Sequence, residues 1–171
     1  MLSLATWTMA AVVALSGRGA PPAFTPVLDS PARHVRTIDR NVDRLIREGF
    51  ANSPTFAALL ERLEQSDVYV YVEDVPRLPS ALEGRLLVLP PSHGFRYLRI
   101  QIARRGTPND SIAVLGHELR HAIEVADEPE VLDTNSLIAL YRRIGIDRGQ
   151  NEYDTVAAQE TGRRVLKELA A

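Results

Sequence analysis

GHELRH, at residues 116–121, places two histidines four residues apart, with a glutamate directly after the first. Residues 108–126 around it predict one continuous helix. Residues four apart on a helix lie on the same face, with Cβ atoms roughly 5–6 Å apart, so two imidazoles can bind one Zn²⁺ at about 2.0–2.1 Å. Glu118 would flank that cation, where it can accept a proton from a metal-bound water. The competing interpretation is an ordinary helix that carries two polar histidines.

The predicted helix has a recognisable N-terminal cap and two different faces. Thr107 can cap it, Pro108 suits its first turn, and Asp110 completes a capping-box pattern. An apolar stripe predicts contact with a core, and the two histidines fall on the opposite side, where we expect a cleft. Gly116 in mid-helix costs roughly 1 kcal/mol relative to Ala, which indicates close approach of another element. The stripe comprises Ile112, Leu115, Leu119, Ala122, Ile123 and Ala126.

The H-E-x-x-H segment resembles the active-site helix of the zincin metallopeptidases. The resemblance implies that His117 and His121 are zinc ligands, that Glu118 is the general base, and that a third ligand lies further along the chain. It also implies a small sheet ahead of the helix, with an edge strand that receives an extended peptide. The likeness is strong over about ten residues and otherwise concerns only the order of the elements.

A third ligand is needed because catalytic zinc usually has three protein ligands and a water. The chain has no Cys and no further His on this helix, so a carboxylate is the expected donor. Asp127 falls six residues after His121, where one zincin branch has its third ligand. That branch also has a Gly three residues after the second His, whereas this chain has Glu124, so Asp127 is a weak candidate.

The last predicted helix, about residues 151–169, offers better candidates. A stripe of small and apolar residues includes Asp154, and burying its carboxylate unpaired would be expensive, so a metal is a natural partner. Asp154 is therefore the preferred third ligand, followed by Glu152 and Glu160. The alternative is that Asp154 merely caps the helix or interacts with its dipole. The related gluzincin branch has Glu here, so the shorter Asp would require the last helix to approach more closely.

The amino terminus has the pattern of an exported protein. Residues 2–15 are apolar and almost uncharged, and small residues follow, so 1–20 is predicted to be a signal peptide or, alternatively, an N-terminal anchor. Residues 21–36 are rich in Pro and small polar residues and are predicted to be a linker. Residues 37–171 form the predicted domain. The predicted location is therefore periplasmic or extracellular, with membrane contact only through an uncleaved N-terminal segment.

The domain begins with two predicted helices, 37–48 and the helix after Ser53-Pro54, with Gly49 expected just past the first. Alternating residues then predict strands at 68–72, 85–89 and 96–103, the last two as an antiparallel hairpin with His93 in its exposed turn. A further helix is predicted at 131–144. The predicted fold is α+β and zincin-like, with a small, mostly antiparallel sheet packed against the H-E-x-x-H helix and further helices.

Composition limits the class of partner. The chain has 171 residues, 45% of them apolar, and a formal net charge of −2, so it suits one soluble domain and gives no reason to expect nucleic acid. The sequence thus predicts an exported zinc-dependent peptidase that acts on peptides or proteins, with Tyr141 or Tyr153 as candidates for oxyanion stabilisation. The alternative is an exported non-catalytic binding or structural domain, with an inert or metal-binding His pair.

Overall fold

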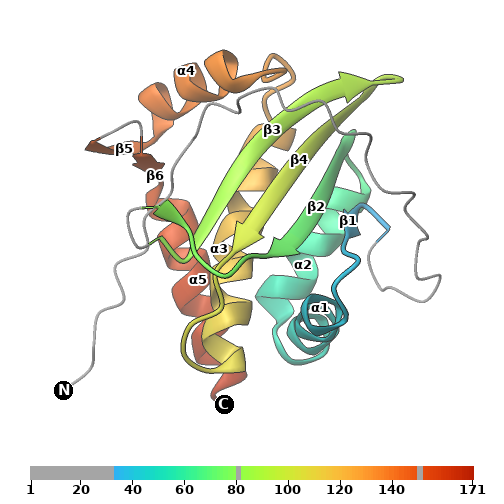
Figure 1. The fold of residues 1–171 in the computed structure, drawn as a ribbon, viewed down its shortest axis with the longest axis vertical. Coiled ribbons are helices and arrows are strands. Elements are labelled where there is room, and N and C mark those ends of the chain that lie inside the picture. The colour runs from blue at the N-terminus through green and yellow to red at the C-terminus, as the bar shows by residue number, and fades with distance from the viewer. Residues whose placement is uncertain (1–32, 80–81, 150–151) are drawn as a thin grey trace.

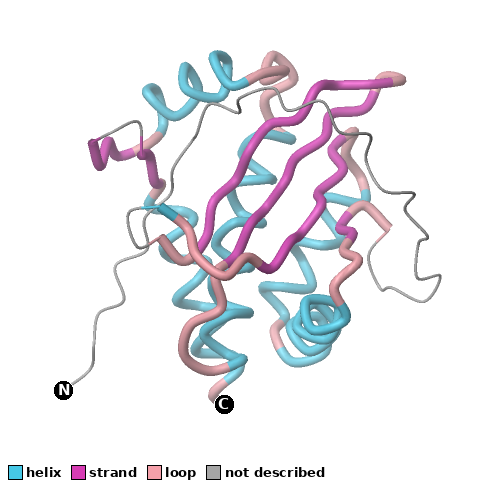
Figure 2. Tube along the Cα trace, in the orientation of Figure 1, coloured by secondary structure: helices cyan, strands magenta, loops and turns pink. Residues whose placement is uncertain are grey.

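A computed structural model describes residues 33–79, 82–149 and 152–171. In these ranges the chain is a mixed α+β protein with five helices, a four-stranded sheet and a two-stranded hairpin (Figures 1 and 2). The elements in chain order are β1 (Val35–Arg36), α1 (Arg40–Asn52), α2 (Pro54–Glu64), β2 (Val68–Asp74), β3 (Gly84–Ser92), β4 (Phe95–Ile102), α3 (Pro108–Ala126), α4 (Thr134–Ile144), β5 (Ile146–Gly149), β6 (Glu152–Asp154) and α5 (Val156–Leu169).

The predicted signal peptide and the linker residues 21–32 lie outside the described residues. The end of the predicted linker does not stay separate from the domain. Val35 and Arg36 form β1, which pairs in parallel with Val70 and Tyr71 of β2. Val35 is buried, so this short strand is held by its contribution to the core as well as by the backbone pairing.

The four-stranded sheet is mixed, and the prediction of a mostly antiparallel sheet is wrong. The predicted β3–β4 hairpin is confirmed, with His93 exposed in its turn. However, β4 inserts between β3 and β2 and runs parallel to β2, and β1 is also parallel to β2. Alternation along a strand reports which side chains are buried but not which strand is its neighbour, so it could not reveal this order.

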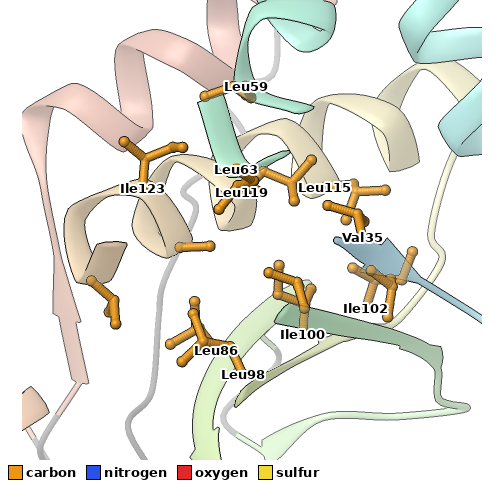
Figure 3. Packing of buried hydrophobic residues seen from close by; sticks show 14 of the residues in the cluster. Val35, Leu59, Leu63, Leu86, Leu98, Ile100, Ile102, Leu115, Leu119 and Ile123 are labelled. Atoms are coloured by element: carbon orange, nitrogen blue, oxygen red, sulfur yellow. The ribbon is translucent and has the colours of Figure 1, made fainter. Parts of the chain in front are cut away.

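The core lies between the sheet and the helices. Alternate residues of β2 and β4 are buried, as the period-two pattern predicted, and they face the apolar stripe of α3. Figure 3 shows Leu115 and Leu119 of α3 opposite the strand residues, with Leu63 of α2 beside them. Each such buried Leu or Ile contributes roughly 1.5–3 kcal/mol through removal from water. This packing holds the apolar stripe of α3 against the sheet.

The first two helices support α3 from the side away from the histidines. Helix α1 begins at Arg40 with Asp39 as its N-cap and continues through Gly49, so the predicted end at Glu48 is wrong. Gly49 lies inside the helix and is buried. A glycine suits this position because a Cβ there would lie 2.9 Å from side-chain atoms of both Ile112 and Phe56. The predicted start of α2 is confirmed, with Ser53 as N-cap and Pro54 in the first turn.

Candidate metal centre

Helix α3 starts as its sequence predicts. The Thr107 side chain accepts from the backbone N–H of Asp110, and the Asp110 carboxylate accepts in return from the N–H of Thr107. The helix then runs to Ala126 and is buried along most of its length. The cleft expected on its histidine side is not open, because α5, β6 and Tyr141 lie against that side and both histidines are buried.

Helix α5 packs lengthwise against α3 through two glycines. A Cβ at Gly116 would lie 3.0 Å from Cγ2 of Val165, and a Cβ at Gly162 would lie 3.3 Å from both the Ala113 carbonyl oxygen and Cβ of His117. The close approach predicted at Gly116 is therefore confirmed. It brings the beginning of α5 near the metal-binding residues predicted on α3, which is the approach that a short Asp side chain requires.

Asp154 reaches the histidines from a strand, not from a helix. The predicted helix over 151–169 is wrong in its first part, because β5 and β6 form a hairpin and α5 starts only at Val156, after the N-cap Thr155. Asp154 ends β6 and is fully buried. Its Oδ1 accepts from the backbone N–H of Thr155 at 2.7 Å, and its Oδ2 accepts from Nε2 of Gln159 at 2.8 Å.

His117, His121 and Asp154 form a cluster that can hold a metal ion. Nε2 of His117 lies 3.2 Å from Nε2 of His121, and Oδ1 of Asp154 lies 3.4 and 3.7 Å from these two nitrogens. A tetrahedral site with bonds of about 2.0–2.2 Å has ligand atoms roughly 3.3–3.6 Å apart. The separations of the three donor atoms are therefore close to those that one shared cation requires, and two imidazoles with one carboxylate are donors that Zn²⁺ accepts.

Glu118 lies beside this cluster. It is 2% exposed, and its Oε2 makes no hydrogen bond within the described part of the chain. A buried carboxyl oxygen without a partner is costly in a purely structural site. Its other oxygen lies against the first residue of β3, since a Cβ added at Gly84 would be 2.5 Å from Oε1.

The protonation of the metal-free cluster follows from burial and neighbouring charge. Burial and the adjacent His121 lower the pKa of His117 to about 3, so this imidazole is neutral. Burial works against a charged His121, but its hydrogen bonds with Asp154 and Glu124 raise its pKa to about 9. A cation bound here would take the place of the His121 proton, because metal ligation needs a neutral imidazole.

The pKa values of the two carboxyl groups at the cluster, Asp154 and Glu118, are shifted in opposite directions. Burial would raise the pKa of Asp154, but hydrogen bonds from His121 and Gln159 help to lower it overall, so the carboxyl is ionised. Burial, aided by Asp154 and Glu124, raises the pKa of Glu118 to about 8. Neighbouring carboxyl groups whose pKa values are shifted in opposite directions are common at functional sites. One reason is that a general base needs a pKa near the working pH.

The other candidate ligands do not join the cluster. Asp127 is the C-cap of α3, is half exposed and pairs with Arg62 at 2.6 Å. Glu160 is exposed on α5. Glu152 begins β6, and its side chain lies outside the described structure. Of the two tyrosines, Tyr141 is the one against the cluster, with its ring centroid 5.3 Å from that of His121.

Sequence reasoning missed Glu124 and Thr155. Glu124 was considered only as the residue that stands in place of a Gly, yet its Oε2 accepts from Nδ1 of His121 at 2.8 Å. The signal was available, because a residue three positions after His121 lies on the same helix face. Thr155 donates from Oγ1 to Oε1 of Glu124 at 2.7 Å, which no sequence spacing indicates.

No protein family, curated protein sequence or solved structure matches this chain. Within the described ranges, none of the helices is long and apolar enough to cross a membrane.

Proposed function

We propose that this domain is a zinc-dependent hydrolase of peptide bonds, of the zincin type that its H-E-x-x-H segment resembles. The observation that carries the proposal is the convergence of the His117, His121 and Asp154 donor atoms within 3.7 Å of one another, beside a buried Glu118. A structural site needs ligands only. A hydrolase also needs an acid–base group next to them, and this arrangement includes one.

The division of roles follows from the positions of the side chains. His117, His121 and Asp154 would hold Zn²⁺, which supplies Lewis acidity toward a carbonyl oxygen and a water. Glu118 accepts the proton of the attacking water at Oε2, which has no hydrogen-bond partner among the described residues, and returns a proton to the leaving amine. Its raised pKa keeps proton uptake and release within reach near neutral pH.

The substrate would be an extended peptide or protein segment. Strand β3 lies at the edge of the sheet in the described part of the chain, and its first residue touches Glu118. An added strand along such an edge gains backbone hydrogen bonds in a sequence-tolerant way. Nucleic acid is not proposed as a partner, because the chain has no excess of basic charge.

Replacing Gly84 by Ala should lower cleavage at least tenfold while zinc content stays the same. The added Cβ would meet Oε1, Cγ and Cδ of Glu118 at 2.5–2.9 Å, so the carboxyl must move, and a displacement of about 1 Å can cost two orders of magnitude. Peptidase assays with zinc analysis check this. Gly94→Ala is the control, because it is strained by its φ of +80° but meets no atom within 4 Å. Equal losses in both variants would show that general destabilisation is responsible.

Export is part of this proposal and rests on the apolar residues 2–15 and the small residues that follow them. The N-terminal sequence of protein recovered outside the cytoplasm checks it. A chain that remains in the cytoplasm with its N-terminus intact contradicts it.

A second candidate, a non-catalytic metal-binding domain, is favoured by the burial of the cluster. His117, His121 and Asp154 are at most 1% exposed, and structural zinc sites are closed whereas catalytic sites keep an open position. Under the first proposal, covering residues must move before a peptide reaches Glu118. Under the second, the site never opens and Glu118 has no chemical role.

Metal removal tests the first proposal directly. The purified protein is expected to contain one Zn²⁺ per chain and to cleave an unstructured protein such as casein. Chelation should abolish cleavage, and added Zn²⁺ should restore it. Stoichiometric zinc without any cleavage would support the second candidate instead, and a protein that binds no zinc when zinc is plentiful would contradict both.

A further inference from the structure

A single buried carboxylate connects the two segments that supply the metal-binding residues. Glu124 lies one turn after His121 on α3 and is 7% exposed. Its two oxygens have different partners: Oε2 accepts from Nδ1 of His121 at 2.8 Å, and Oε1 accepts from Oγ1 of Thr155 at 2.7 Å. Nε of Arg120 lies 3.7 Å from Oε1, and the Tyr141 hydroxyl is also close.

The bond to His121 fixes which ring nitrogen is available. A carboxylate at Nδ1 keeps the proton on that nitrogen, so the lone pair of the neutral ring is on Nε2. Nε2 is the atom that lies 3.2 Å from Nε2 of His117 and 3.7 Å from Oδ1 of Asp154. The carboxylate therefore sets both the orientation of the ring and the tautomer that a metal ligand needs.

The bond to Thr155 acts on the other segment. Thr155 directly follows Asp154, and the backbone N–H of Thr155 donates to Oδ1 of Asp154. Thr155 is also the N-cap of α5, where its Oγ1 accepts from the N–H of Ala158. Holding the Thr155 hydroxyl therefore holds the residue that orients the Asp154 carboxylate. The Glu124 side chain therefore links α3 to the β6–α5 junction next to the cluster.

We infer that Glu124 is a positioning residue that sets His121 and Asp154 jointly in the geometry for one cation. This inference rests on the proposed metal centre and adds a residue that does not touch the metal. Partners of this kind typically change metal affinity by 10–100-fold when they are removed. A purely structural role would change the stability of the metal-free protein but not the coordination of a bound ion.

The test uses the full chain, stripped of metal and titrated with Zn²⁺ against a chromophoric chelator and with Co²⁺ by visible absorption. Glu124→Gln keeps the volume, but its amide cannot accept at both positions. We expect Zn²⁺ affinity to fall 10–100-fold and the Co²⁺ bands to change. Glu160→Gln, which alters an exposed carboxylate on α5, should leave both readouts unchanged.

If Glu124→Gln does not fold, two variants of Thr155 test the same inference. Thr155→Val removes the donor to Oε1, and Thr155→Ser retains it together with the N-cap. We expect a smaller loss of affinity in the first and near wild-type affinity in the second. A Zn²⁺ affinity within twofold of wild type in Glu124→Gln, with unchanged Co²⁺ bands, would overturn the inference, as would equal affinities for the two Thr155 variants. A wild-type chain that binds neither ion overturns the proposed function itself.

Discussion

Replacing Asp154 by Ala is expected to lower Zn²⁺ affinity at least a hundredfold. Structural zinc sites in small peptides contribute about 10–16 kcal/mol, so one of three protein ligands accounts for several kcal/mol. The change also leaves His121 and His117 without the carboxylate that lies 3.4–3.7 Å from their Nε2 atoms. Competition with a chromophoric chelator measures the loss.

Thermal unfolding gives an independent readout of the same change. At a free Zn²⁺ concentration 100 times the dissociation constant, binding stabilises the folded state by about 2.7 kcal/mol. In a chain of this size, that amount corresponds to a rise in Tm of roughly 5–10 °C. The wild-type protein should show this rise on adding Zn²⁺, and Asp154→Ala should lose most of it.

Asp127→Ala and Glu160→Ala serve as matched controls for Asp154→Ala. Both remove a carboxylate that was a candidate from the sequence, but neither residue joins the cluster, because Asp127 pairs with Arg62 and Glu160 is exposed. Both variants should bind Zn²⁺ as the wild type does. Wild-type affinity in Asp154→Ala would move the third ligand to another residue, with Glu152 the nearest in sequence.

The success and failure of the sequence predictions have a common cause. The start of α3 was predictable because Thr107, Pro108 and Asp110 act within one turn. The start of α5 was not, because the pairing that makes residues 152–154 a strand depends on β5, a short partner without a clear alternating pattern. Asp154 was correctly expected to lie close to His117 and His121, even though the helix predicted around it is wrong. The expectation rested on its burial, and a buried carboxylate needs a charged partner whether it lies on a helix or on a strand.

The parts of the site that sequence could not supply are contacts between segments distant in the chain. Nothing in the sequence relates Gly84 to Glu118, or Thr155 to Glu124, because these pairs meet only when β3 and the β6–α5 junction pack on α3. The order of strands has the same origin, since β4 lies beside β2 although β3 intervenes in the chain. Local patterns therefore identified the helix that carries two of the three candidate metal ligands, and tertiary packing determined its surroundings.

Replacing Glu118 by Gln is expected to leave Zn²⁺ binding within a few-fold of wild type and to lower peptide cleavage at least a hundredfold. The amide keeps the volume of the side chain but cannot accept the proton of the attacking water, and general base catalysis contributes about 10²–10⁴-fold. Zinc analysis and casein cleavage on the same preparation measure both effects. Equal cleavage in both proteins would remove Glu118 as the base, and absence of cleavage in both would favour the non-catalytic candidate.

The same variant should be more stable than the wild type when both are metal-free at pH 7–8. In the unfolded chain Glu118 ionises near its ordinary pKa of 4.5, whereas burial raises its pKa to about 8 in the folded protein. Between these values the folded state holds one more proton, so the free energy of unfolding falls as pH rises. Gln does not titrate, and the variant should therefore gain a few kcal/mol relative to wild type by pH 8 and little at pH 4. Denaturant unfolding at several pH values measures this gain, with Glu160→Gln as the exposed control; a difference that does not change between pH 4 and pH 8 would show that the folded protein does not keep Glu118 protonated. Added Zn²⁺ should reduce the gain by less than about 1 kcal/mol, because the variant is expected to bind Zn²⁺ within a few-fold of wild type.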